Sequence, residues 1–214
     1  MVLNIDKPGS ISSSGMQRLR ETYKFVFLGI FTCIMGCIIA LPYASNISTA
    51  VWIGFIILEF AALFLFMFKK NALTYALFTL ISGITLIPVI SSFLGANLGY
   101  VIIQALVATA SIVGLLTMYT LTTKKDYLQY GTILFYILIG IIILSLLNIF
   151  FGNSIFSLLI SSVAVVLFSF YIIVDTQEVL VTDIEPLDAA MNIYLDILNI
   201  FVSLLNILGI LEKD

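Results

Sequence analysis

The sequence predicts an all-α membrane protein in which six transmembrane helices surround a central seventh helix. Three observations lead to this prediction: the composition, seven long apolar stretches, and a stripe of polar residues along the last of them. Of the 214 residues, 62% are hydrophobic and 10% are charged, whereas a soluble domain carries about 25% charged residues. So few charged side chains cannot cover a surface that faces water, so we expect the lipid bilayer as the chain's surroundings.

Seven stretches are long enough to cross a membrane, since a spanning helix needs about 20 mainly apolar residues. Their ranges are 25–43, 51–68, 72–94, 98–121, 130–151, 156–181 and 187–211. We divide the chain into an N-terminal tail, residues 1–22, and a seven-helix transmembrane domain, residues 23–214. Within the third stretch, "SGITLIPV" combines small residues with Pro88, which predicts a kinked and closely packed helix.

The basic residues predict how the helices are oriented. Eight of the nine Lys and Arg residues lie before the first span or directly after the second and fourth spans, whereas the alternate connections carry no charge. The positive-inside rule therefore predicts a cytoplasmic N-terminal tail and an external C-terminus. We expect a multi-pass protein of the plasma membrane. The sixth connection is also on the cytoplasmic side, but it is acidic: it holds Glu178, Asp183, Glu185 and Asp188.

Composition also excludes several classes of function. No basic run of the kind that binds nucleic acid is present, and the chain has no histidine. Cys33 and Cys37 lie one helical turn apart in an apolar stretch and are better explained as buried small residues than as metal ligands, because a metal site needs more ligands. A retinal protein needs a lysine within a span, and none is found there.

The seventh span carries a polar stripe. Its members are Asn192, Asp196, Asn199, Ser203 and Asn206. Their spacing of 4, 3, 4 and 3 residues places all five on one face of a helix. A polar stripe in lipid must face protein or water, so we expect this helix to lie at the centre of the bundle. The alternative is that these side chains only hold neighbouring helices together.

Two aspartates belong to this region, Asp175 near the end of the sixth span and Asp196 within the stripe. The two helices are antiparallel and joined by a short link, so the carboxylates reach a similar depth. Two ionised carboxylates in contact repel each other, so a pair that shares one proton is expected, and such a pair responds to pH. Alternatively, each aspartate meets an amide or a backbone group separately.

Two further charged residues complete the predicted site. Glu59 lies in the middle of the second span, where a carboxylate is costly and commonly functional. Lys70 follows three turns later on nearly the same face. It either anchors the cytoplasmic end of the span or reaches toward Asp175.

Three motifs together resemble the transmembrane Bax inhibitor-1 motif-containing family in its bacterial branch: "SGITLIP", "FSFYIIVDTQ" and "NIYLDILNIF". The resemblance covers nearly the whole chain. It implies a six-helix shell around a central seventh helix, and calcium leak across a membrane that depends on pH. It also implies that Asp175 and Asp196 form the pH-sensing latch. The basic residue that ends the second span is often arginine in relatives; Lys70 cannot form the same planar fork.

The predicted function is therefore a pH-sensitive calcium-leak channel, not an enzyme, without a bound cofactor and with calcium ions and protons as its partners. Calcium prefers oxygen ligands. We predict Asp175, Asp196 and Glu59 as its carboxylate ligands. The predicted ion pathway comprises Glu59, Asn192, Asn199, Ser203 and Asn206, and the gating residues are Asp175, Asp196 and Lys70.

Two alternatives use the same carboxylates. A proton-coupled carrier of a small solute also needs groups that gain and lose protons. An intramembrane aspartyl protease also takes aspartates from neighbouring helices, but such enzymes resemble one another in Gly-x-Gly-Asp and Pro-Ala-Leu motifs. Here Asp196 follows "IYL", and no proline precedes Ala-Leu.

Overall fold

The computed structural model describes residues 12–212, and within this range the chain is helical, with no β-strand. The elements in chain order are α1 (Ser13–Ala40), η1 (Leu41–Tyr43), α2 (Thr49–Lys69), α3 (Ala72–Thr85), α4 (Ile87–Gly95), α5 (Gly99–Thr122), η2 (Leu128–Tyr130), α6 (Gly131–Phe151), α7 (Ser154–Val181) and α8 (Pro186–Leu211). Seven helical segments are long and apolar enough to span a membrane, with α3 and α4 forming one of them. The predicted all-α class with seven spans is confirmed.

The first helix begins earlier than the sequence prediction placed it. The Ser12 side chain caps α1 by accepting a hydrogen bond from the Gly15 backbone N–H at 3.0 Å. Leu19 and Thr22 are buried. Residues 13–22, which we assigned to the tail, are therefore the first turns of a packed helix. The remainder of the predicted tail, residues 1–11, lies outside the described residues.

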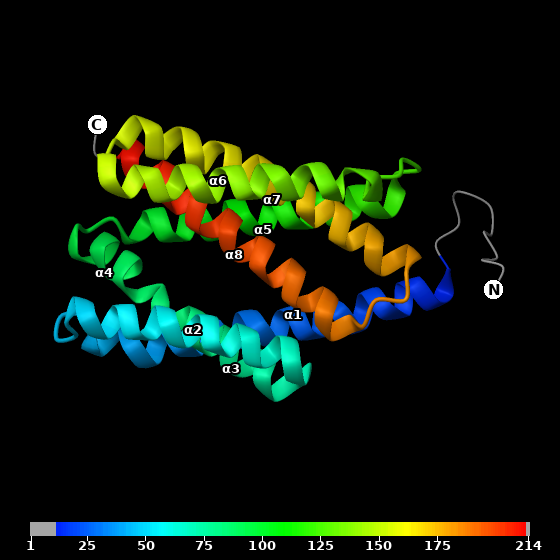
Figure 1. The fold of residues 1–214 in the computed structure, drawn as a ribbon, viewed down its shortest axis with the longest axis horizontal. Coiled ribbons are helices and arrows are strands. Elements are labelled where there is room, and N and C mark those ends of the chain that lie inside the picture. Colours follow the sequence, from blue (N-terminus) through cyan, green and yellow to red (C-terminus); the bar gives the residue numbers. More distant parts are fainter. Residues whose placement is uncertain (1–11, 213–214) are drawn as a thin grey trace.

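The third span is broken, as the proline predicted. Helix α3 ends at Thr85 and α4 begins at Ile87, with Pro88 in its first turn. Proline has no N–H to donate to the preceding turn, and its ring clashes there. The chain therefore changes direction at Leu86, and α4 leaves the line of α3 (Figure 1).

Helix α8 lies between two groups of helices, α1–α3 on one side and α5–α7 on the other (Figure 1). It packs mainly against α7, α1 and α5, whereas α2 packs mainly on α3, and α6 mainly on α7. The central position predicted for the last helix from its polar stripe is confirmed. Helices α2 and α6 form the outer layers of the two groups.

Glycines bring α1 and α3 into close contact. A Cβ atom added to Gly83 would lie 1.9 Å from the Cys33 carbonyl oxygen, and one added to Gly36 would lie 2.1 Å from the Leu80 carbonyl oxygen. No side chain larger than hydrogen fits at either position. Small residues allow this close backbone approach in membrane bundles, where packing rather than the hydrophobic effect holds helices together.

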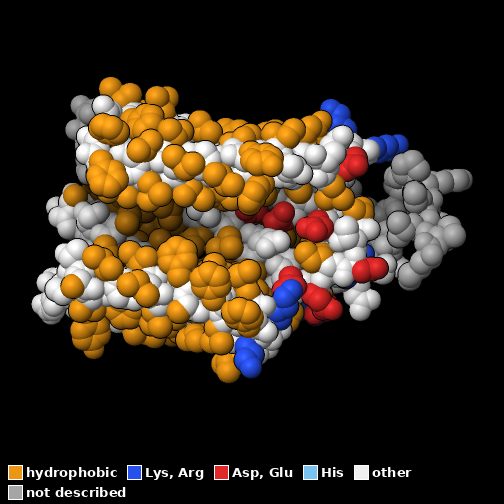
Figure 2. All heavy atoms as spheres, viewed as in Figure 1, with side chains coloured by type: hydrophobic (Ala, Val, Ile, Leu, Met, Phe, Trp, Pro, Cys, Tyr) orange, Lys and Arg blue, Asp and Glu red, His pale blue; other side chains and the backbone are white. Residues whose placement is uncertain are grey.

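The outer surface is apolar along most of its length. Large side chains such as Phe68 and Phe150 are more than 80% exposed. Figure 2 shows hydrophobic side chains over most of the viewed face, with charged side chains gathered toward the end of the bundle where α1 begins. An apolar band of this kind matches the hydrocarbon core of a bilayer, and a polar end matches its interface.

Candidate functional site

The stripe of α8 and the face behind it differ in chemistry. Helix α8 begins at Pro186. Proline is favoured at the first position of a helix because the N–H group that it lacks would have no partner there. Tyr194, Phe201 and Leu205 are buried and lie on the face opposite the stripe. Within the stripe, Asp196 is buried and Asn192 is exposed. The other three members are half-buried: Asn199, Ser203 and Asn206.

A second stripe on α7 faces the first, and sequence reasoning missed it. Counting back from Asp175, the spacing 4, 3, 4, 3 and 4 reaches Tyr171, Phe168, Ala164, Ser161 and Ser157. Residues at this spacing share one helical face. Because only Asp175 is charged, the pattern is less conspicuous than that of α8. Counting back from Asp175 at this spacing in the sequence would have revealed the stripe on α7.

The two stripes border one cavity of about 820 Å³. Its floor is the whole polar stripe of α8, and α7 supplies Ser161, Tyr171 and Asp175. Helix α6 supplies a mainly apolar wall with one hydroxyl, that of Ser145, and α4 closes the far end with Val89 and Phe93. Figure 2 shows a hollow between the two groups of helices on the viewed face.

Asp175 and Asp196 come together at one end of the cavity. Both carboxyl groups border the cavity, and they are close enough for each to act on the charge of the other. Asp196 is only 5% exposed, and its Oδ2 atom has no donor. Two carboxylates both accept hydrogen bonds, so neither can satisfy the other unless a proton lies between them. A shared proton would supply the missing donor.

The amides of the stripe are partly engaged with protein. Asn206 Nδ2 donates to Ser157 Oγ at 2.8 Å and to Ser161 Oγ at 2.7 Å, which ties α8 to α7. Asn199 Nδ2 donates to the Leu195 carbonyl oxygen of its own helix at 2.7 Å. With the amide nitrogens used in this way, the side-chain carbonyl oxygens remain as acceptors along the cavity.

Glu59 lies elsewhere, although we predicted it for the ion pathway. Its two carboxylate oxygens accept hydrogen bonds from Ser82 Oγ at 2.7 Å and Thr85 Oγ1 at 2.8 Å. It belongs to α2 and faces α3, and it does not line the cavity. Hydroxyl donors on the neighbouring helix stabilise this carboxylate in the membrane, so the structure separates it from the aspartate pair.

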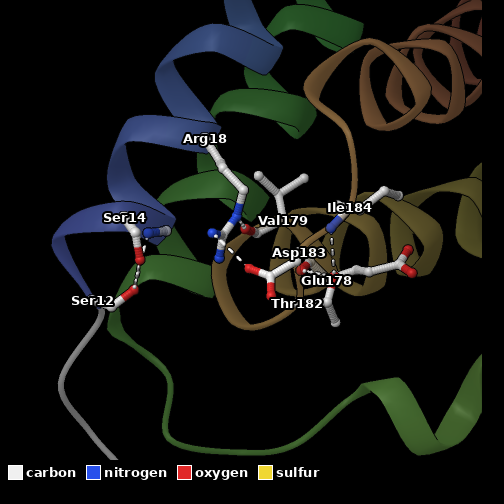
Figure 3. Close-up of polar contacts among 9 residues, drawn as sticks. Ser12, Ser14, Arg18, Glu178, Val179, Thr182, Asp183 and Ile184 are labelled. Atoms are coloured by element: carbon white, nitrogen blue, oxygen red, sulfur yellow. Dashed lines mark hydrogen bonds and ion pairs between the residues drawn. The ribbon is translucent and has the colours of Figure 1, made fainter.

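The link between α7 and α8 is held by two basic residues. Lys70 Nζ lies 2.5 Å from Asp188 Oδ2 in the first turn of α8, so it contacts this carboxylate rather than the aspartate pair. Arg18 reaches from α1 and donates through Nε to the Val179 carbonyl oxygen at 3.1 Å, and through Nη1 to Asp183 Oδ1 at 3.1 Å (Figure 3). The acidic link is therefore tied to both α1 and α2.

Metal-binding capacity at the cavity rests on two carboxylates. Among residues 12–212, no group of three or more His, Cys, Asp or Glu residues is placed to hold a metal ion. Asp175 and Asp196 could ligate one only with help from amide and hydroxyl oxygens. Such a site would be weak compared with a dedicated calcium cage, which takes six to eight oxygen ligands.

Comparison with known proteins identifies the family. The family described as "Inhibitor of apoptosis-promoting Bax1" matches residues 15–213. An uncharacterised protein of Helicobacter pylori is 37% identical over 90% of this chain and 86% of its own length. A membrane protein of Vibrio cholerae is 32% identical over 98% of this chain and its whole length. The modulator of FtsH protease YccA of Escherichia coli is 33% identical over 64% of this chain and 63% of its own length. These similarities show that the chain belongs to the Bax inhibitor-1 family and is one of its multi-pass membrane proteins.

Proposed function

We propose that this protein is a pH-sensitive calcium-leak channel whose ion path runs through the α8 cavity. One observation carries the proposal: a single cavity collects the aspartate pair and every residue of the polar stripe. Polar and ionisable side chains within a membrane commonly mark ion paths. We further propose that the N-terminus is cytoplasmic, because the basic connections share one end of the bundle. The membrane we propose is the plasma membrane.

The lining suits a conducted cation better than a stored one. Calcium takes oxygen ligands from carboxylates, amide carbonyls and water. Along the cavity, Asp196, Asn199 and Asn206 offer such oxygens one after another rather than in one cage. An ion that is held weakly at successive positions can leave each of them, which conduction requires.

The aspartate pair is the proposed gate. Asp175 is on α7 and Asp196 is on α8, so the attraction or repulsion between their carboxyl groups acts directly on the contact between these helices. With one shared proton the pair holds the helices together. When both carboxylates ionise they repel each other, and this repulsion favours separation. Flux should therefore vary with pH.

Calcium flux into proteoliposomes that contain only this protein, measured across pH, tests the proposal. Asp175→Asn and Asp196→Asn each keep the side-chain shape and remove the coupled titration, so we expect flux whose pH response is lost. Glu59→Gln is the matched control, because it removes a membrane carboxylate that lies outside the cavity. Retention of the parent pH response in both aspartate variants would exclude the pair as the gate.

A proton-coupled carrier of a small solute is the second candidate. The cavity volume favours it, because about 820 Å³ falls within the range of small-molecule pockets, about 300–1,000 Å³. The proteoliposome experiment separates the two functions. Proton-driven uptake of a neutral solute, with no calcium flux at any pH, would replace the channel with the carrier.

A further inference from the structure

The shape of the cavity limits what can occupy it. The stripe from Asn192 to Asn206 spans about 21 Å at 1.5 Å per residue. A cavity of about 820 Å³ spread over this length has a mean cross-section of about 40 Å². An extended alkyl chain, which is much narrower than an α-helix, fits along this length.

The charged residues of the cavity are confined to one end, although the polar stripe of α8 runs along its whole floor. Asp175, Asn192 and Asp196 lie at the end near the α7–α8 link, and Phe93 and Ile149 line the opposite end. Between them, the α6 wall presents Leu138, Ile142 and Leu146. One end can hold a polar head group, and the remainder can hold an alkyl chain.

The charge at the polar end is uncompensated. Among the described residues, the cavity is lined by two aspartates and by no Lys or Arg. Lys70 and Arg18 form ion pairs with Asp188 and Asp183. Asp196 is 5% exposed, and its Oδ2 atom has no hydrogen-bond donor. A cationic head group would complement this end, and an anionic one would be repelled.

Access from the bilayer is available at the side. The hollow in Figure 2 opens on a face that is otherwise covered by hydrophobic side chains. Ile142, on the α6 wall, is 50% exposed although it lines the cavity. A molecule dissolved in the hydrocarbon core could therefore enter between the two helix groups without crossing water.

We propose that this cavity binds a single-chain cationic amphiphile that enters sideways from the bilayer. Its ammonium head lies against Asp175 and Asp196, and its alkyl chain lies along α6 toward Phe93. The distance from Asp196 to Asn206 along α8 is about 15 Å, which suits a chain of about twelve carbons. The proposal does not require that the protein conduct calcium.

The experiment compares three radiolabelled probes that differ in their head group: dodecyltrimethylammonium, dodecanol and dodecanoate. Binding is measured to the protein in phosphatidylcholine nanodiscs, and binding to empty nanodiscs is subtracted. We expect one saturable site at which the ammonium probe binds at least about tenfold more tightly than dodecanol, since one charged contact of about 1.4 kcal/mol gives this factor. Dodecanoate should bind more weakly than dodecanol.

Three variants locate the site. Replacing both Asp175 and Asp196 by asparagine should lower the affinity for the ammonium probe to that of dodecanol, because the charge is lost and the shape is kept. Glu59→Gln should leave all three affinities unchanged. Ile142→Trp should narrow the side opening and should weaken the binding of both the ammonium probe and dodecanol. Equal binding of the ammonium probe and dodecanol to the parent protein would overturn the proposal. An ammonium preference that survives when both aspartates are replaced by asparagine would also overturn it. Neither outcome depends on a flux measurement, so the calcium proposal can fail or succeed separately.

Discussion

The two sides of α8 accommodate a carboxylate within the membrane in different ways. On the side of α1–α3, the membrane carboxylate Glu59 receives two hydroxyl hydrogen bonds, and glycines bring the α1 and α3 backbones together. On the side of α6 and α7, Asp196 faces a second carboxylate and lacks a donor for Oδ2, and a cavity separates the helices. We call these the packed side and the open side.

This difference separates a carboxylate whose hydrogen-bond donors are in place from one that lacks a donor. A buried polar group whose hydrogen-bond partners are in place stabilises a single arrangement of the helices. A buried acceptor without a donor can instead bind a proton, an ion or a ligand. Position in the sequence does not reveal which case applies, because Glu59 and Asp196 both lie well inside apolar spans. Which case applies depends on the hydrogen-bond donors that the neighbouring helix supplies.

The largest expected effect concerns a pair of glycines. On the packed side, Gly83→Ala places a methyl group against the Cys33 carbonyl oxygen, so α1 and α3 must move apart. We expect a loss of about 3 kcal/mol in the free energy of unfolding, at the upper end of the usual cost of overpacking. Thermal or denaturant unfolding in bicelles measures it.

Gly140→Ala is the matched control on the outer wall of the open side. A Cβ added there meets nothing within 4 Å, so stability should change by no more than about 1 kcal/mol. Equal losses in the two variants would contradict the distinction between a packed side and an open side.

Much of the fold could be predicted because membrane helices leave strong signals. Seven apolar stretches, the broken span at Pro88 and the central α8 all follow from composition and spacing. The start of α1 was placed too late because residues 13–22 are polar in part, and their burial depends on contact with α7. Gly15 shows this contact, since a Cβ there would lie 2.3 Å from the Leu180 carbonyl oxygen.

The site could be predicted only where one helix carried the whole pattern. The α8 stripe has a polar residue at every position, so its face was recognised, and the short link brought Asp175 near Asp196. The placement of Glu59 depends on Ser82 and Thr85 of another helix. Likewise, the contact of Lys70 with Asp188 depends on where two connections meet. Such tertiary contacts have no signature within a single stretch of sequence.

The second effect tests the carboxylate of the packed side. Glu59→Ala leaves the Ser82 hydroxyl without its acceptor, whereas the Thr85 hydroxyl keeps the Ser82 carbonyl oxygen, so stability should fall by about 1–2 kcal/mol. Glu59→Gln retains one acceptor oxygen and should lose less. Asp196→Asn on the open side removes a charge that faces another carboxylate, so it should not destabilise the protein. The free energy of unfolding of the three variants is measured in the same bicelles. A larger loss of stability in Asp196→Asn than in Glu59→Ala would contradict this expectation.

The third effect separates helix contact from the ion path within the stripe. Asn206 donates to two serines of α7, whereas Asn192 is exposed at the other end. Asn206→Ala should therefore cost about 1 kcal/mol, as interhelical hydrogen bonds in membranes typically do, and Asn192→Ala should cost little. If both alanine variants conduct calcium as the parent does, the stripe acts as a helix contact only, and the proposed path is wrong.

The smallest effect concerns Lys70, which joins the two sides at the link. Its backbone is left-handed, with φ of 43°, a conformation that costs a non-glycine residue about 1 kcal/mol. Its ion pair with Asp188 is partly exposed to solvent, and such pairs contribute about 0–1 kcal/mol. Lys70→Met loses the ion pair and keeps the strained backbone, so stability should fall by about 0.5 kcal/mol.

Lys70→Gly loses the same pair but relieves the backbone, so it should be more stable than Lys70→Met by about 1 kcal/mol. The two variants thereby separate charge from conformation in one unfolding series. Because Lys70 contacts Asp188 and not the aspartate pair, neither change should move the pH at which calcium flux is half-maximal. A shift in Lys70→Met that Lys70→Gly shares would show that the lysine charge acts on Asp175 and Asp196 across the link. The gate would then extend from the open side to the corner between α2 and α3.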